Sequence, residues 1–174
     1  MSLQGTNQWR HKMRAIGQVG KLFASTIKPT SDMTGVIFVP VPPSKIETDP
    51  EYDPRIVQAL QKASEISGVN LPTCQCITQQ ENTEPDHRSG ATRLTPSERA
   101  ASYNVHLDRI PQNTRLAVIV DDVLTTGSHF KGIEMALKNY LPQIQVNGLF
   151  VARTIHTNPF DDFDNLDLSK ILNQ

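Results

Sequence analysis

The sequence has few cysteines, a net charge close to zero and no long hydrophobic run. The 174 residues include two cysteines, Cys74 and Cys76, too few for a disulfide-rich scaffold, and their spacing favours neither a disulfide nor a shared metal. The formal net charge is −1, so bulk electrostatics favours neither nucleic acid nor a membrane surface as a partner. No apolar run approaches the roughly 20 residues of a membrane span, and no signal peptide is visible. We therefore expect a cytoplasmic protein without a membrane span.

The most informative stretch is LAVIVDDVLTTGSHF, residues 116–130. It opens with five apolar residues, 116–120, which are too few for a helix and rich in β-branched side chains, a pattern typical of a strand buried in a parallel sheet. Asp121 and Asp122 follow at once, then a turn of small and hydroxyl residues, then an amphipathic run that predicts a helix. The predicted order is therefore strand, carboxylate pair, hydroxyl–glycine turn and helix.

Each part of this stretch suits one portion of a ribose 5-phosphate. Asp121 and Asp122 offer only acceptors, which suit a ribose diol or a hard cation such as Mg²⁺. The turn precedes a helix N-terminus, which favours a phosphate, and Gly127 lets the backbone approach a ligand closely. The candidate 5-phosphate contacts are Thr125, Thr126, Gly127 and Ser128. The alternative interpretation is a capped helix after a strand whose acids are merely solvated.

A second buried strand, predicted over residues 35–39, leads into the stiff loop PVPPSK at 40–45. Three prolines restrict this loop, which ends in a hydroxyl and an ammonium group. Ligands of open α/β sheets bind beyond the carboxyl ends of the strands, so a loop at this place suits an anion. Ser44 and Lys45 are therefore candidate anion contacts, with an ordinary proline-bounded turn as the alternative.

The rest of the sequence, taken with these segments, predicts a single α/β domain with a twisted, mainly parallel sheet flanked by helices. We expect helices at about 8–26 and 55–67 and strands at 73–78 and 144–153. A long polar segment at 79–95 precedes a helix start near Thr95, and such segments are usually functional or disordered. The expected divisions are a basic N-terminal helical extension at 1–34, a core at 35–154 and an acidic tail or hood at 155–174.

The segment VIVDDVLTTGS resembles the phosphoribosyl pyrophosphate (PRPP) loop of type I phosphoribosyltransferases. The segments VPVPPSK at 39–45, RLTPSERAASYNV at 93–105 and VART at 151–154 resemble the ComF-like branch of that family. The resemblance covers roughly residues 36–154. ComF-like proteins commonly carry an N-terminal zinc-binding cysteine cluster, and this sequence has none, so the chain is at most a relative of that branch.

The resemblance implies a Rossmann-like type I fold and a reaction in which PRPP and Mg²⁺ deliver ribose 5-phosphate to a nitrogen acceptor. It implies that Asp121 and Asp122 bind the ribose hydroxyls and, through PRPP, the Mg²⁺ ion, while the turn binds the 5-phosphate. A homodimer is common in the family. The implied pyrophosphate contacts are Ser44, Lys45, Arg93 and Arg99, and the implied acceptor-stacking rings are Phe160 and Phe163. The alternative for the two arginines is a solvated loop, and for the two phenylalanines packing within a solvated tail.

Two other functions stay open at this point. One is a non-catalytic PRPP- or nucleotide-binding regulator or partner protein, because no general base is identified. The other, less favoured, is a factor that contacts nucleic acid through the basic helix at 8–28. Thr125 stands where enzymes acting on 6-oxopurines usually place an acid, so the resemblance disfavours hypoxanthine or guanine as the acceptor.

Overall fold

A computed structural model of the chain describes residues 7–27, 33–83 and 94–154. These residues form a three-stranded parallel sheet in the order β1–β4–β5 and a separate antiparallel pair, β2–β3. The strands are β1 (Val36–Pro40), β2 (Ile77–Gln79), β3 (Tyr103–Val105), β4 (Leu116–Leu124) and β5 (Gln145–Arg153). The prediction of an α/β fold with a parallel sheet flanked by helices is confirmed at this level.

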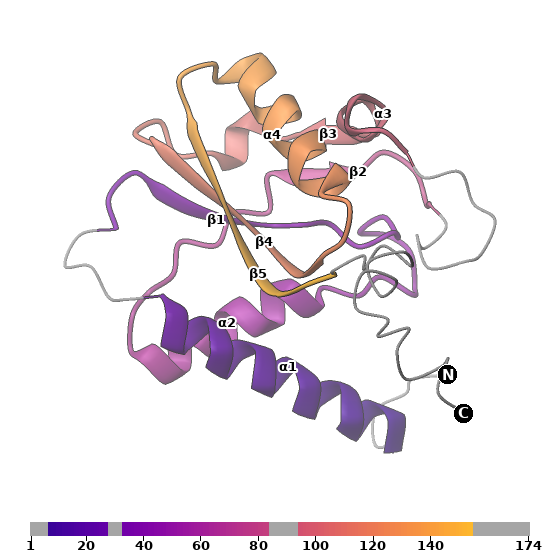
Figure 1. Ribbon diagram of the computed structural model, residues 1–174, viewed down its shortest axis with the longest axis vertical. Helices are drawn as coiled ribbons and strands as arrows, with labels where there is room; N and C mark the ends of the chain where they lie inside the picture. The colour runs from indigo at the N-terminus through magenta and orange to yellow at the C-terminus, as the bar shows by residue number, and fades with distance from the viewer. Residues whose placement is uncertain (1–6, 28–32, 84–93, 155–174) are drawn as a thin grey trace, which may run out of the picture.

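Helices cover both faces of the parallel sheet (Figure 1). On one face lie α1 (Asn7–Thr26) and α2 (Arg55–Ser67), side by side. On the other face lies α4 (Ser128–Tyr140), together with the short α3 (Pro96–Ala101) and the β2–β3 pair. A 3₁₀ turn at Leu107–Arg109 leads from β3 towards β4. The molecule is therefore built in three layers, with the parallel sheet in the middle.

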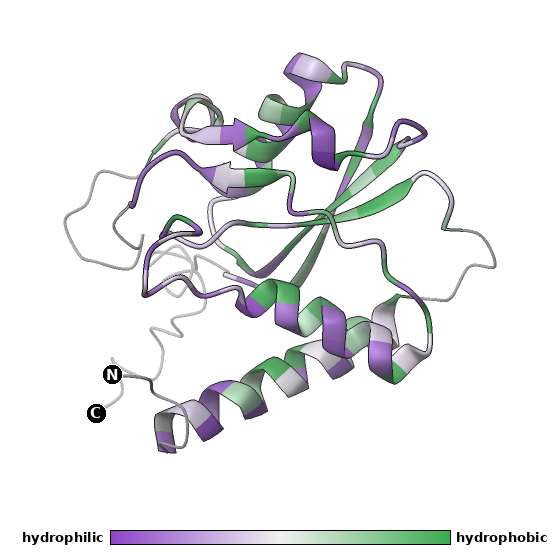
Figure 2. Cartoon of the chain, turned by 180° about the vertical axis from the view of Figure 1, so that it is seen from behind, coloured by the Kyte–Doolittle hydropathy of each residue, from purple (hydrophilic) through white to green (hydrophobic). Residues whose placement is uncertain are grey.

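Two hydrophobic cores fill the spaces between these layers. Ile37 and Val39 of β1 pack with α4 and the β2–β3 pair, whereas Phe38 packs with α1 and α2. This alternation is the period-two pattern of a strand that is buried on both faces. The hydrophobic residues accordingly gather along the central strands and on the helix faces turned towards them (Figure 2). Full burial of each such side chain contributes roughly 1.5–3 kcal/mol.

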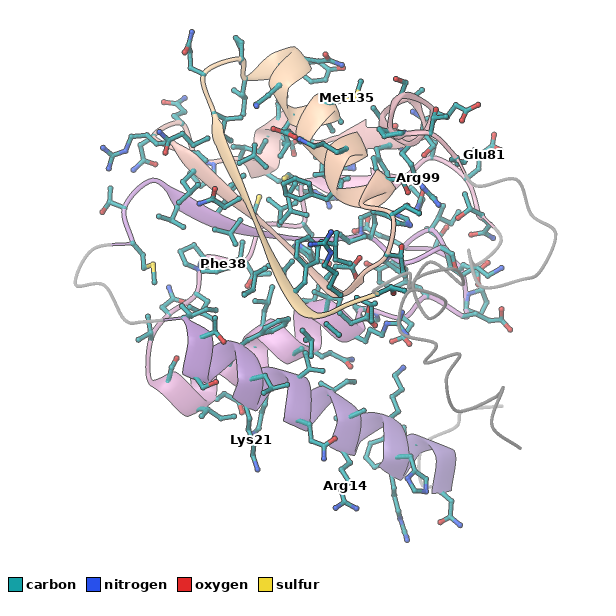
Figure 3. All side chains as sticks on the ribbon, in the orientation of Figure 1. Arg14, Lys21, Phe38, Glu81, Arg99 and Met135 are labelled. Atoms are coloured by element: carbon teal, nitrogen blue, oxygen red, sulfur yellow. The ribbon has the colours of Figure 1, made fainter. Side chains whose placement is uncertain are left out.

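The N-terminal helix α1 packs on α2 through a close crossing at a glycine. A Cβ atom at Gly20 would lie 2.8 Å from the Cβ of Lys62 and 3.0 Å from the carbonyl oxygen of Ala59. The basic side chains Arg14 and Lys21 point away from the body of the protein (Figure 3). The predicted basic amphipathic helix thus buries its apolar side against α2. Among the described residues, no helix is long and apolar enough to cross a membrane.

The segment predicted as a strand over 73–78 is shorter in the structure. Thr73 forms an isolated bridge with Phe38, and regular pairing begins only at Ile77. Cys74 and Cys76 lie between these points as buried free thiols, in the core that β1 shares with α4 and the β2–β3 pair. The hydrogen bond between the two thiols and the burial of Cys76 raise the pKa of Cys76 well above its usual range, so it stays protonated.

Candidate functional site

A cavity of about 570 Å³ opens at the carboxyl ends of β1 and β4. Its wall is formed by the loop after β1, the end of β4 with the turn that follows, the start of α2, and one side of β2. Thr154, directly after β5, also lines it. In open parallel α/β sheets this edge is where ligands bind, because successive strands all end there in loops. The cavity is therefore the candidate site.

The carboxylate pair lies within β4 and not after it, because the strand continues to Leu124. Asp121 still pairs with Phe150 in the ladder to β5. Its Oδ1 accepts a hydrogen bond from the backbone N–H of Asp122 at 2.9 Å. Burial, with the neighbouring charge of Asp122 as the second cause, raises the pKa of Asp121 to about 7. Close to neutral pH, Asp121 is therefore only partly ionised.

Arg55, the first residue of α2, lies beside this pair and also lines the cavity. Its Nη2 lies 3.5 Å from Oδ2 of Asp122, and both side chains are partly exposed. Such an exposed ion pair contributes little to stability, on the order of 0–1 kcal/mol. Its relevance is to the site, because Arg55 adds a positive charge directly beside the two acceptors.

The carboxylate pair suits a hard cation only if other groups complete its shell. Asp121 and Asp122 provide oxygen atoms and an excess of negative charge that a cation would relieve. No cluster of three or more histidine, cysteine, aspartate or glutamate side chains occurs within residues 7–27, 33–83 and 94–154. The oxygen atoms of the pair are of the kind that a hard cation such as Mg²⁺ takes as ligands, and other groups would have to complete its coordination.

The turn after β4 presents two hydroxyl side chains to the cavity. Thr125 and Thr126 are exposed and line it, whereas Ser128 is buried behind them. The Oγ1 of Thr126 accepts a long hydrogen bond, 3.4 Å, from the N–H of Ser128. Gly127, the N-cap residue of α4, has φ 78°, a left-handed conformation that glycine adopts without strain, and it contributes no side-chain hydrogen bond to the helix. The predicted hydroxyl–glycine turn is thus present, with Gly127 and Ser128 supporting it from outside the cavity lining.

The proline-rich loop after β1 brings Ser44 and Lys45 to the same cavity. The carbonyl oxygen of Ser44 accepts a hydrogen bond from the N–H of Thr83 at 2.7 Å. Asn82 accepts another through Oδ1 from the N–H of Ile46, at 2.9 Å. These bonds tie the loop to the chain that follows β2, so its position does not depend on proline stiffness alone.

Of the two predicted arginines, Arg99 lies in α3, after the helix start that was predicted near Thr95. It is 2% exposed and lines the cavity. The helix begins with a complete capping box, in which Thr95 and Glu98 bond to each other's backbone N–H groups, and this fixes the segment. Arg93, Phe160 and Phe163 lie outside the described residues.

Sequence reasoning did not single out Gln79 or His129, and both line the cavity. Gln79 opens the polar run 79–95 and looked like a loop residue, yet it is the last residue of β2 and is 4% exposed. His129 directly follows the hydroxyl–glycine turn, and its Nδ1 lies 2.8 Å from the hydroxyl oxygen of Tyr103. The position of His129 in the motif was a usable signal, whereas the burial of Gln79 depends on contacts distant in sequence.

The described residues thus define an α/β protein with a cavity, lined by both polar and apolar side chains, at the carboxyl edge of its parallel sheet. No protein-family model matches the chain, and a search of curated proteins finds no similar sequence. The resemblance to the PRPP loop therefore rests on the motif itself.

Proposed function

We propose that this chain is a PRPP-dependent phosphoribosyltransferase of type I fold, related to the ComF-like branch. The observation that carries the proposal is the meeting of three predicted parts in one cavity. The carboxylates Asp121 and Asp122, the threonine turn, and the Ser44–Lys45 loop all line it, although the loop lies far from the others in sequence. Loops after the adjacent parallel strands β1 and β4 meet at this edge in any such sheet, so the support comes from the acceptor, hydroxyl and ammonium groups that these loops bring together.

In this proposal, each part of PRPP has a complementary partner. The two carboxylates accept hydrogen bonds from the ribose diol, and the hydroxyls of Thr125 and Thr126 donate to the 5-phosphate. Ser44, Lys45 and Arg99 face the pyrophosphate and balance its charge. A Mg²⁺ ion bound with PRPP would neutralise further pyrophosphate charge. The family expectations of a homodimer and a cytoplasmic location belong to the same proposal.

The reaction would replace one bond at C1 of the ribose by another. The C1–O bond breaks, and pyrophosphate leaves with the electron pair. The lone pair of a nitrogen nucleophile then forms the C1–N bond, and the nitrogen releases its proton to the solvent. The protein would accelerate this exchange by holding both partners in position and by stabilising the charge that develops on pyrophosphate.

The experiment is a calorimetric titration of PRPP with Mg²⁺ into the wild-type protein and into Asp122→Asn. The variant loses charge-assisted hydrogen bonds worth roughly 1.5–3 kcal/mol, so its affinity should fall about tenfold or more. Asp108→Asn, which removes an exposed carboxylate outside the cavity, is the matched control and should bind like the wild type.

Two outcomes divide the possible functions. Binding followed by pyrophosphate release with a nitrogen acceptor supports the transferase, and binding without release with any acceptor supports a PRPP-binding regulator. Absence of binding by the wild type at millimolar PRPP would refute both.

A further inference from the structure

The apolar side of α1 continues beyond the part that α2 covers. Five residues recur at intervals of three or four and therefore lie on one face of the helix: Trp9, Met13, Ile16, Gly20 and Phe23. Ile16 and Phe23 are buried in the core shared with α2, whereas Trp9 and Met13 are 36% and 40% exposed. This end of α1 extends past α2 (Figure 1). The packing face of α1 is thus left exposed along its first two turns.

The same two turns carry positive charge. The helix contains no acidic residue, and Arg10, Lys12 and Arg14 lie beside the exposed face. Lys12 is paired, since its Nζ lies 2.8 Å from Oδ1 of Asp53, but neither arginine forms an ion pair with another described residue. An occupant of this face would therefore meet an apolar centre with positive charge at its flank. An acidic segment that carries large apolar side chains has the matching chemistry.

The direction of the face disfavours a membrane or a nucleic acid as its occupant. Trp9 and Met13 share the side of α1 that packs on the body of the protein, whereas Arg14 and Lys21 point away from it (Figure 3). A flat membrane surface would meet the outward side instead. A nucleic acid would engage the cations and leave the two apolar side chains exposed.

The residues that follow β5 have the matching composition. Between positions 155 and 174 the sequence holds four aspartates, one lysine and no arginine. Two phenylalanines, Phe160 and Phe163, lie among the acids. We call residues 155–174 the acidic segment. It combines the negative charge and the apolar side chains that the exposed face of α1 lacks.

The acidic segment starts close to this face. Thr154 lines the same cavity as Asp53, the ion-pair partner of Lys12. Leu149 packs into the core shared with α1 and α2, and Val151 faces the same layer because alternate residues of a strand share a face. Phe160 follows Thr154 by six residues, which span up to roughly 20 Å when extended, about twice the length of two helical turns. The connection is therefore long enough to return along α1.

We propose that the acidic segment of the same chain docks on the face of α1 formed by Trp9 and Met13, beside Arg10 and Arg14. A short connection favours such docking, because it gives the segment a high effective concentration at the face. The proposal gives the two phenylalanines a packing role in place of acceptor stacking. It does not depend on the transferase proposal.

The test uses the fluorescence of Trp9, which is the only tryptophan of the chain. In the full chain, a segment variant replaces the four aspartates by asparagine: Asp161→Asn, Asp162→Asn, Asp164→Asn and Asp167→Asn. We expect its emission to move to longer wavelength, and its quenching by acrylamide to increase towards that of the urea-unfolded chain. About 1 M NaCl should produce the same kind of change in the wild type and little change in the variant, because the Debye length is then only about 3 Å.

Variants on the helix side test whether the two partners act on one contact. Arg10→Glu/Arg14→Glu should change the Trp9 signal as the segment variant does, and the combined variant should show little further change. The matched control is Lys21→Glu, an exposed position of the same helix beside the part packed on α2, and it should leave the signal as in the wild type.

An unchanged Trp9 signal in the segment variant, additive effects of the two sets of substitutions, or no response of the wild type to salt would each overturn the proposal. A wild-type signal that depends on protein concentration would assign the contact to a second copy and overturn docking within one chain. Because none of these measurements contains PRPP, their failure is separate from that of the transferase proposal.

Discussion

The ionisation of Asp121 makes a quantitative prediction about stability in the absence of any ligand. Asp121 has a pKa of about 7 in the folded protein, against an ordinary value of 3.8. Between these two values the folded chain binds more protons than the unfolded chain, so the free energy of unfolding falls as the pH rises. This decrease in the free energy of unfolding is complete once the pH lies above the pKa of Asp121 in the folded protein, about 7.

The size of this loss follows from the shift of about three pKa units. At 1.36 kcal/mol for each unit, the upper limit is about 4 kcal/mol. Asp121 keeps some contact with solvent at the cavity wall, so we expect about half of this, roughly 2 kcal/mol, in the measured stability. Asp121→Asn removes the titration and should therefore be more stable than the wild type at pH 8 by about 2 kcal/mol.

The assay is urea unfolding of the wild type and Asp121→Asn from pH 4 to pH 8. The difference between their free energies of unfolding should grow across this range, because titrations common to both proteins cancel. Asp108→Asn, at an exposed position outside the cavity, should follow the wild type throughout. Asp122→Asn should move the transition to lower pH, since the neighbouring charge that helps to raise the pKa of Asp121 is gone. Parallel profiles for the wild type and Asp121→Asn would refute this account of the carboxylate pair.

Two further predictions concern the scaffold. Gly20→Ala should lower the free energy of unfolding by about 1–3 kcal/mol, because its Cβ would lie 2.8 Å from the Cβ of Lys62. Gly17→Ala should raise it by roughly 0.5–1 kcal/mol through helix propensity, because a Cβ there meets no described residue within 4 Å. Equal effects of the two substitutions in urea unfolding would refute the close crossing of α1 and α2. Thr95→Ala should cost about 1 kcal/mol by removing the capping box of α3, and Thr95→Ser should restore most of it in the same measurement.

The sequence predicted the elements whose signal is local. The helix over 55–67 has the predicted bounds, and Gly68 ends it with φ 68°, a conformation that glycine adopts without cost. The buried strand before the carboxylates was predicted from its β-branched run. Its extension through Asp121 to Leu124 was not, because β5 continues to pair with it there through the backbone, which leaves no trace in side-chain type.

The residues that line the cavity also fall into two groups, those with a local sequence motif and those without one. The carboxylates, the threonine turn and the Ser44–Lys45 loop carried motifs, and all of these parts line the cavity. Gln79 and Arg99 lie in polar surroundings in the sequence, and their burial comes from the pairing of β2 with β3 and the packing of α3 on α4. The hydrophobic periodicity of a segment does not report contacts between residues distant in sequence. A polar residue in such a segment is therefore predicted to lie in a loop until the fold is known.

The order in which the parallel strands join the sheet has a consequence for folding. Leu116 of β4 pairs with Gln145 of β5 and with Val36 of β1. The chain between Leu116 and Val36 is nearly three times longer than the chain between Leu116 and Gln145. The longer closure costs about 1 kcal/mol more in chain entropy, which favours early assembly of β4, α4 and β5. This unit contains the carboxylates and the threonine turn. That part of the candidate site would then form before β1 and the loop that follows it join the sheet.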